Sequence, residues 1–249
     1  MELDVLGSSG TYPAPGTPTS GYLISHGTTR VLCDIGFGVM AELMRRVPPD
    51  GLEAVVLSHR HPDHCADFFA LHHALAYGPY SRRGMPVYTA PGVADRIADF
   101  LGAGEGHVLF ETFDFHEVGS ANHVTVGSID LRFAVTAHSV PTVATRFEAG
   151  GRSLVYSADT GPGGGFPELC HGASVLLVEA SLAGDRGDHE VAHHLTAAEA
   201  AQIAIDAGAG KLILTHLRPE LDKARSIAEA ASVFGGTVMA AIPGEIHSI

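Results

Sequence analysis

Short apolar runs of strand length recur along almost the whole chain and restrict the folds that it can adopt. They are rich in β-branched and aromatic residues, which favour strands. The clearest runs cover residues 3–6, 21–25, 30–35, 52–58, 85–90, 129–137, 143–150, 153–158, 175–180, 211–215 and 237–242. Strands in meanders, interrupted by helices, predict two sheets packed face to face with helices outside.

Helical periodicity separates some of these runs. It is clearest over residues 64–77, 91–101, 196–208 and 222–233. Thr196 and Glu199 have the spacing of a capping box, and Gly208 fits the end of that helix. The pattern of strands and helices roughly repeats after residue 128, and no Pro/Gly/Ser-rich stretch is long enough to be a linker. We therefore expect one domain over residues 1–249, built of two similar halves.

Composition excludes several classes of protein. Hydrophobic residues make up 45% of the 249 residues, enough for a sizeable core, and the formal net charge of −13 disfavours binding to a phosphate backbone. The three cysteines, at positions 33, 65 and 170, have no CxxC spacing and fit reduced thiols. The sequence shows neither a secretion-signal pattern nor an apolar run near the roughly 20 residues of a membrane span. We expect a cytoplasmic protein with no membrane segment.

The strongest local signal is the motif HxHxDH, which directly follows the apolar run 52–58, a pattern typical of a buried strand. His59 and His61 are two apart in extended chain, so their rings point to the same side and can bind one metal ion. Pro62 fits the first turn of a helix, which turns Asp63 and His64 toward a second metal ion beside the first. Imidazole and carboxylate ligands suit Zn²⁺, with Mn²⁺ or Fe²⁺ as alternatives.

Further residues of ligand type follow other predicted strands. His138, Asp159 and His216 each come directly after an apolar run, as His59 does. Side chains at equivalent strand ends converge on one edge of a sheet, where loops hold a site on a rigid scaffold. The sequence therefore predicts one site with several metal ligands.

HxHxDH followed by an isolated His, an isolated Asp and a last His resembles the metallo-β-lactamase superfamily over essentially the whole chain. The resemblance implies an α/β (α+β) fold, a four-layer αββα sandwich of two mixed sheets with helices outside. It implies two zinc ions, one held by His59, His61 and His138 and the other by Asp63, His64 and His216, with Asp159 bridging.

Asp34 ends the run VLCDI and matches the first motif of that superfamily. The resemblance implies that this aspartate orients ligand imidazoles. As a plain strand-end aspartate it would have no such role, and the sequence leaves both interpretations open.

The branch of the superfamily is indicated by two segments. Asp159 stands where the true β-lactamases commonly have a cysteine, which disfavours that activity. The stretch HHLTAAEAAQIA at 193–204 resembles the phosphodiesterase branch that includes ribonuclease Z, in which a histidine just before a helix cap reaches the scissile phosphate. That resemblance assigns to His194 the role of general acid, or of hydrogen-bond donor to the phosphoryl oxygens. His193 is the competing candidate.

The resemblance implies hydrolysis of a small phosphodiester, such as a cyclic nucleotide. A metal-bound hydroxide would attack phosphorus, Asp63 and Asp159 would position it, and His194 would assist the leaving group. We expect two Zn²⁺ as cofactors and, from the resemblance alone, a homodimer as one possible assembly.

Three alternatives stay open. A tRNA 3′-processing endonuclease of ribonuclease Z type is disfavoured because no long basic arm separates Asp159 from His216 and lysine occurs only twice. The metals would equally serve a lactone or thioester hydrolase. A metal-stabilised binding module without turnover would also retain the ligands.

Several features have both a functional and an ordinary interpretation. Glu179 is either an acid close to the site or a solvated strand-end residue. Arg82 and Arg83 either meet a substrate phosphate or lie in a solvated loop, and residues 103–123 form either a lid or a dimer contact.

Overall fold

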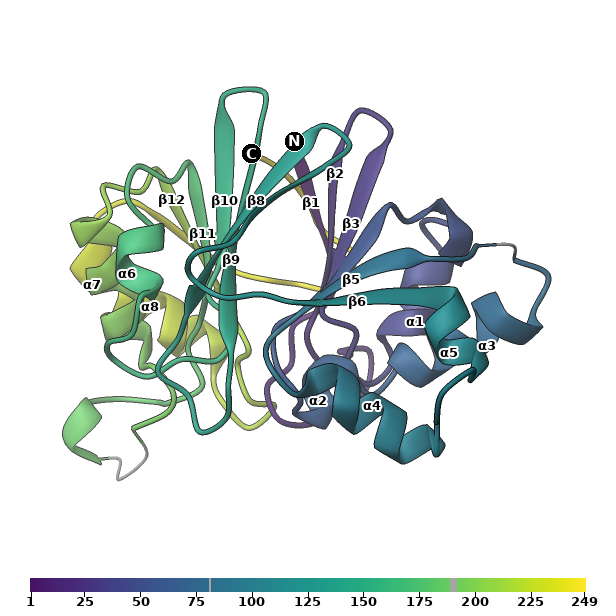
Figure 1. Cartoon of the computed structure of the whole chain (residues 1–249). Helices are drawn as coiled ribbons and strands as arrows, with labels where there is room; N and C mark the ends of the chain where they lie inside the picture. The colour runs from purple at the N-terminus through teal and green to yellow at the C-terminus, as the bar shows by residue number, and fades with distance from the viewer. Residues whose placement is uncertain (81, 189–191) are drawn as a thin grey trace.

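The computed structural model describes residues 1–80, 82–188 and 192–249. Within these residues the strands form two seven-stranded sheets that lie between two groups of helices (Figure 1). Each sheet contains parallel and antiparallel pairs, so the predicted α/β arrangement of two mixed sheets with helices outside is confirmed.

The first sheet has the strand order β14-β1-β2-β3-β4-β5-β6. Its antiparallel part runs from β14 to β3, and its parallel part runs from β3 to β6. The last strand of the chain thus returns to pair with the first. The strands are β1 (Glu2–Gly7), β2 (Gly21–His26), β3 (Thr29–Cys33), β4 (Ala54–Leu57), β5 (Met85–Thr89), β6 (Phe113–Glu117) and β14 (Ile246–Ser248).

The second sheet repeats this design with the order β13-β12-β11-β10-β9-β8-β7. It is antiparallel from β7 to β10 and parallel from β10 to β13. The strands are β7 (His123–Val126), β8 (Ile129–Val135), β9 (Val143–Ala149), β10 (Arg152–Tyr156), β11 (Val175–Glu179), β12 (Lys211–Thr215) and β13 (Thr237–Ala240). Two halves of the same construction therefore face each other.

Helices cover the outer face of each sheet (Figure 1). Those of the first half are α1 (Val39–Met44), α2 (Pro62–Cys65), α3 (Phe68–Tyr77), α4 (Val93–Leu101) and α5 (Val108–Thr112), with a 3₁₀ turn at Pro49–Gly51. Those of the second half are α6 (Phe166–Leu169), α7 (Ala197–Asp206) and α8 (Lys223–Phe234), with a 3₁₀ turn at Arg186–Asp188. No helix in the described ranges combines the length and apolar character of a membrane span.

Two expectations about local structure need correction. The single helix expected over 64–77 is divided into α2 and α3, because Asp67 between them binds the neighbouring loop: its backbone N–H donates to the carbonyl of Ile35 and its carboxylate accepts from the N–H of Met40. The middle of the stretch 103–123 forms α5 and β6, and β6 pairs with β5, so this stretch is not a free lid.

Apolar side chains fill the space between the two sheets and the space under the helices. Tyr22 of β2 and Tyr156 of β10 meet between the sheets with ring centroids 4.9 Å apart, and both are buried. Under α7, the buried alanines at 197, 200, 201 and 204 bring the helix close to the second sheet. The capping box predicted for Thr196 and Glu199 is present.

Strain in the backbone gathers where strands end. Among the described residues, the non-glycine residues with a left-handed φ are Thr11, Asp34, Ala158 and His216, with φ between 52° and 65°. Asp34 follows β3, Ala158 follows β10 and His216 follows β12. Such conformations cost about 1–3 kcal/mol each and persist where the surrounding structure enforces them. The strained strand ends lead to the site described next.

Candidate metal centre

The structure brings all seven predicted ligands into one cluster between the sheets. The first sheet contributes residues that follow β4 and begin α2, and the second contributes residues that follow β8, β10 and β12. Two groups have their ligand atoms within 4.8 Å of one another, namely His59, His61, His138 and Asp159, and Asp63, His64 and His216.

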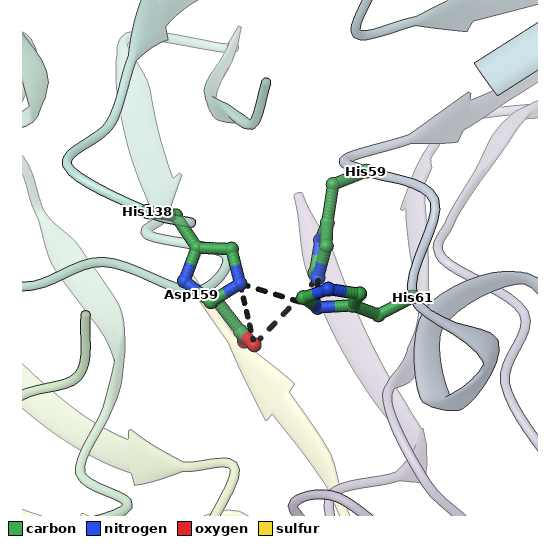
Figure 2. A group of neighbouring side chains, drawn as sticks. All are labelled: His59, His61, His138 and Asp159. Carbon is green, nitrogen blue, oxygen red and sulfur yellow. Dashed lines mark hydrogen bonds and ion pairs between the residues drawn. The ribbon is translucent and has the colours of Figure 1, made fainter. Parts of the chain in front are cut away.

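In the first group the ring nitrogens point toward one another (Figure 2). Nδ1 of His61 lies 3.0 Å from Nε2 of His59 and 3.2 Å from Nε2 of His138. Oδ2 of Asp159 lies 3.6 Å and 3.8 Å from those same two Nε2 atoms. Ligand atoms of a tetrahedral zinc site, with bonds of about 2.0–2.1 Å, are themselves about 3.3 Å apart. The spacing of the first group therefore fits a metal ion.

The second group has a similar spacing and more negative charge. Nε2 of His216 lies 3.2 Å from Nε2 of His64 and 3.1 Å from Oδ2 of Asp63. Oδ1 of Asp159 lies 3.2 Å from Nε2 of His64 and 3.4 Å from Nε2 of His216. Two carboxylates and two imidazoles thus converge here.

Asp159 connects the two groups because its oxygens face different ways. Oδ2 faces the first group and Oδ1 faces the second. The side chain is almost completely buried, and Oδ1 has no hydrogen-bond partner in the described part of the chain. A buried carboxylate oxygen without a partner is costly, and a cation between the groups would satisfy it. This donor set fits two metal ions that share one carboxylate.

The pKa values of the site residues differ between the two ligand groups. Burial, together with the neighbouring charge of His64, places the pKa of His59 well below its usual range. Burial also lowers the pKa of His61 and of His138, so these three rings are neutral, the form that binds metal. Burial alone would raise the pKa of Asp159, but His216 and His64 hold it well below its usual range. The second group therefore combines ionised carboxylates with His64, whose pKa burial alone would lower but the charges of Asp159 and Asp63 raise well above its usual range.

Hydrogen bonds fix His59 and His64 with Nε2 toward the centre. Nδ1–H of His64 donates to Oδ2 of Asp34 at 2.7 Å, and the hydroxyls of Ser58 and Tyr156 donate to the same oxygen at 2.7 and 2.9 Å. The Ser58 hydroxyl in turn accepts from Nδ1–H of His59 at 3.0 Å. Asp34 thus makes the contact that its predicted orienting role requires.

A second buried carboxylate, that of Glu179, orients histidines on the side of the second sheet. Glu179, at the end of β11, is fully buried, so it is not a solvated strand-end residue. Its Oε1 accepts from Nδ1–H of His194 at 2.8 Å, and its Oε2 accepts from the Ser181 hydroxyl at 2.9 Å. That hydroxyl accepts from Nδ1–H of His216 at 2.7 Å. One carboxylate therefore orients both histidines.

His194 and His193 occupy different environments. Ligand atoms of His194, Asp159 and His216 lie within 4.8 Å of one another. Burial by itself would lower the pKa of His194, but the hydrogen bond and charge of Glu179 raise this pKa to about 9. His193 is exposed and contributes its backbone carbonyl, which accepts from Nδ1–H of His138 at 3.0 Å. A protonated His194 beside the two ligand groups can donate a hydrogen bond or a proton.

Comparison with known proteins agrees with this geometry. A family model described as a beta-lactamase superfamily domain matches residues 29–217. The chain belongs to the metallo-β-lactamase superfamily. It is 34% identical to the probable metallo-hydrolase YhfI of Bacillus subtilis, over 98% of each chain. The crystal structure of YhfI superposes with a TM-score of 0.88 at 31% identity, covering 99% of this chain and 98% of that one.

Two other relatives extend the comparison. Ribonuclease Z of Methanopyrus kandleri is 27% identical over 96% of this chain and 95% of its own. A diphosphatase of the PhnP family has the same fold, with a TM-score of 0.77 at 16% identity, covering 99% of this chain and 96% of that one. Membership of the superfamily and the His/Asp groups together make the chain a metallo-hydrolase of the β-lactamase fold.

Several residues of the candidate site were not predicted from the sequence. Ser58, Tyr156 and Ser181 carry no chemistry of their own, and only the strand register shows that their hydroxyls orient Asp34 and the ligand histidines. The backbone N–H of Thr11 donates to Oδ2 of Asp63 at 2.9 Å. Their positions in the sequence could have indicated them, since Ser58 immediately precedes HxHxDH and Tyr156 lies in the apolar run 153–158.

The arginine pair singled out in the sequence lies away from the metallo-β-lactamase site. A guanidinium nitrogen of Arg82 donates to the carbonyl of Glu53 at 3.5 Å, and one of Arg83 donates to the carbonyl of Leu75 at 3.1 Å. Neither arginine is among the residues that surround the metal groups, so the expectation of a phosphate contact here is not supported.

Proposed function

We propose that the protein is a dinuclear metal-dependent phosphodiesterase that acts on a small substrate such as a cyclic nucleotide. The observation that carries this proposal is the orientation of Asp159, whose two oxygens face two separate ligand groups. We propose Zn²⁺ as the metal, with Mn²⁺ or Fe²⁺ as alternatives. One ion would be held by His59, His61, His138 and Asp159, and the other by Asp63, His64, His216 and Asp159.

When bound, two such ions lower the pKa of a water molecule and neutralise charge on the oxygens of a phosphodiester. The chain supplies the rest of the chemistry. Asp63 and Asp159 stay ionised, because His64 and His216 hold both pKa values low despite burial, and these carboxylates position the attacking water.

His194 acts on the leaving group. Glu179 binds its Nδ1–H, so the ring has one fixed orientation and presents Nε2 on the side of Asp159 and His216. With a pKa of about 9 the ring is protonated at neutral pH. Nε2–H therefore donates its proton to the leaving oxygen, or a hydrogen bond to the phosphoryl oxygens.

A small substrate fits the charge of the chain better than RNA does. The net charge is −13, and RNA binding depends on neutralising several phosphates with Lys and Arg. The 27% identity to a ribonuclease Z over 96% of the chain nevertheless favours a tRNA-processing endonuclease as the second candidate. Hydrolysis of a lactone or thioester is the third, since the metal groups do not select the bond.

A substrate panel with metal analysis tests the proposal. The purified protein is assayed for metal content and for turnover of bis(p-nitrophenyl) phosphate, cyclic nucleotides, acyl-lactones, thioesters and precursor tRNA at physiological salt. We expect two metal ions per chain and turnover of the small phosphodiesters. Lactone or thioester turnover without phosphodiester turnover would contradict the proposal, and specific precursor tRNA cleavage would favour the second candidate.

A cytoplasmic location and a homodimer also remain proposals. Cell fractionation with an antibody tests the first, and light scattering of the metal-loaded protein tests the second.

A further inference from the structure

A cavity of about 620 Å³ lies against α2, α3 and α4, beside the metal loop. Its walls include three aromatic rings, Phe37, Phe69 and Phe100, and two basic side chains, Arg60 and Arg96. A volume of this size falls within the usual range of small-molecule sites. None of these five side chains is used by the proposed mechanism.

The aromatic rings form an exposed surface for stacking. Phe100 of α4 stacks on Phe69 of α3 with ring centroids 4.3 Å apart and an interplanar angle of 29°. Phe100 is nevertheless 73% exposed, and Phe37 is 38% exposed. Aromatic side chains that leave their faces open to water around one cavity mark a binding surface for a flat apolar group.

Two arginines, Arg60 and Arg96, and one carboxylate, Asp99, line the cavity, which leaves it an excess of positive charge. Neither Arg60 nor Arg96 has an ion-pair partner within residues 1–80, 82–188 and 192–249, whereas Arg45, Arg46 and Arg225 are each paired with a carboxylate. In a chain of net charge −13, two unpaired guanidinium groups at one cavity favour an anionic ligand.

The cavity borders the loop and helix that carry four of the seven proposed metal ligands. Arg60 lies between the ligands His59 and His61 in the sequence, and neighbouring Cα atoms are about 3.8 Å apart. Pro62 and Cys65 of α2 also line the cavity, and they flank the ligands Asp63 and His64. The cavity therefore lies within a few residues of the metal ligands, at the distance that the two ends of one nucleotide could span.

We propose that this cavity binds the nucleobase of the substrate, with Phe100 as the stacking residue. The inference rests on the proposed phosphodiesterase function, and it specifies the substrate as a nucleotide. The base would stack on the outer face of Phe100, and Arg60 and Arg96 would attract the anion toward the metal loop.

Two product-like probes isolate the contribution of the base. Adenosine 5′-monophosphate and ribose 5-phosphate share the phosphate and the pentose and differ by the base. Both are titrated calorimetrically into the metal-loaded wild-type protein and into Phe100→Ala. Phe110→Ala is the matched control, because Phe110 is 47% exposed on α5 and does not line the cavity.

We expect the wild-type protein to bind adenosine 5′-monophosphate about tenfold more tightly than ribose 5-phosphate, the order of one base–aromatic stack. Phe100→Ala should lose this preference and keep its affinity for ribose 5-phosphate within twofold, while Phe110→Ala should keep both affinities. Equal binding of the two probes by the wild-type protein, or an unchanged preference in Phe100→Ala, would overturn the inference.

The same titrations separate this inference from the proposed function. A Phe100-dependent preference for adenosine 5′-monophosphate in a protein that hydrolyses no phosphodiester would retain the nucleobase site and reject the phosphodiesterase. Phosphodiester turnover without that preference would retain the phosphodiesterase and reject the nucleobase site.

Discussion

At the scale of single residues, the candidate site depends on buried carboxylates that fix imidazole rings. Asp34 and Glu179 are both fully buried, and they orient His64 and His194 directly. Each carboxylate also accepts bonds from a serine or tyrosine hydroxyl, so its charge is satisfied without solvent. The rings therefore have a fixed direction before any ligand binds.

The first prediction concerns the two adjacent histidines at 193 and 194. In the proposed mechanism the His194 ring donates to the leaving group but is not needed to bind metal. His194→Ala should therefore keep the metal content and lower kcat on a phosphodiester by about 100-fold, the lower end of general acid catalysis. His193→Ala is the matched control and should stay within about twofold, because His193 contributes its backbone carbonyl. Elemental analysis and steady-state kinetics on both variants provide the check, and equal activity in the two variants would remove the role of His194.

The choice between these two histidines could not be made from the sequence. Both precede the same predicted helix cap, and a shift of one residue would exchange their positions. The structure separates them because the Glu179 carboxylate reaches only one of the two rings. By contrast, the seven residues of ligand type could be predicted to lie together, since each follows a strand or lies in HxHxDH.

At the scale of secondary structure elements, the start of α7 and the 3₁₀ turn at Arg186–Asp188 act as a support for His194. Arg186 donates to the carbonyl of His194 and to the carboxylate of Glu199, at 2.5 Å in each case. Glu199 also accepts from the N–H of Thr196 at 2.8 Å within the capping box. One arginine therefore connects the cap of α7 to the backbone of the proposed catalytic histidine.

The second prediction follows from this connection. Arg186→Leu should let the backbone around His194 move, lowering kcat on a phosphodiester about tenfold while leaving KM and the metal content nearly unchanged. Arg186→Lys should restore part of kcat, since it returns the charge but not the planar fork. Arg225→Leu is the control, because Arg225, in the first half of α8, forms an exposed ion pair with Glu229. A loss of metal in Arg186→Leu, or an unaltered kcat, would contradict the positioning role.

The third prediction concerns α3 and the pH dependence of stability. His72 is buried on α3 beside Phe113, and burial, followed by the charges of His73 and His107, lowers its pKa to about 4. The unfolded chain binds this proton near pH 6.5, so stability should fall as the pH drops from about 6.5 to about 4, by up to about 3 kcal/mol.

Urea unfolding of the wild-type protein, His72→Leu and His73→Leu at pH 7 and pH 4.5 measures this contribution. His72→Leu should lose less stability on acidification than the wild-type protein, because no buried imidazole then has to gain a proton. His73→Leu is the neighbouring control and should keep most of the acid loss, because the burial of His72, the largest cause of its lowered pKa, is unchanged. An equal acid loss in all three proteins would assign the pH dependence to other groups.

At the scale of the whole molecule, the two ligand groups lie at the boundary between two similar halves, and both halves contribute side chains to them. His59, His61, Asp63 and His64 come from the first sheet and its helices, whereas His138, Asp159 and His216 come from the second. Apolar runs were enough to predict two mixed sheets, because strand ends and helix patterns are local features. The return of β14 to pair with β1 was not predictable, because a three-residue strand that begins far along the chain has too weak a pattern.

The fourth prediction is that bound metal holds the two halves together. Without cations, the carboxylates of Asp63 and Asp159 both lie against Nε2 of His216 in a buried site, and strained residues such as Asp34 and His216 must be held by the fold alone. Each metal ion that binds only the folded state adds about 2.7 kcal/mol when its free concentration is 100 times Kd. Chelation should therefore lower Tm by several degrees, and added Zn²⁺ should restore it.

Calorimetry of the chelated and the zinc-loaded protein tests this directly. Asp159→Asn should show a much smaller zinc-dependent rise in Tm, because it removes a carboxylate that faces both groups. His194→Ala should keep the full rise, because in the proposed mechanism that ring serves turnover. If the chelated and zinc-loaded wild-type proteins melt at the same temperature, the cluster does not bind zinc in the folded state, and its histidines and aspartates must be explained by their hydrogen bonds alone.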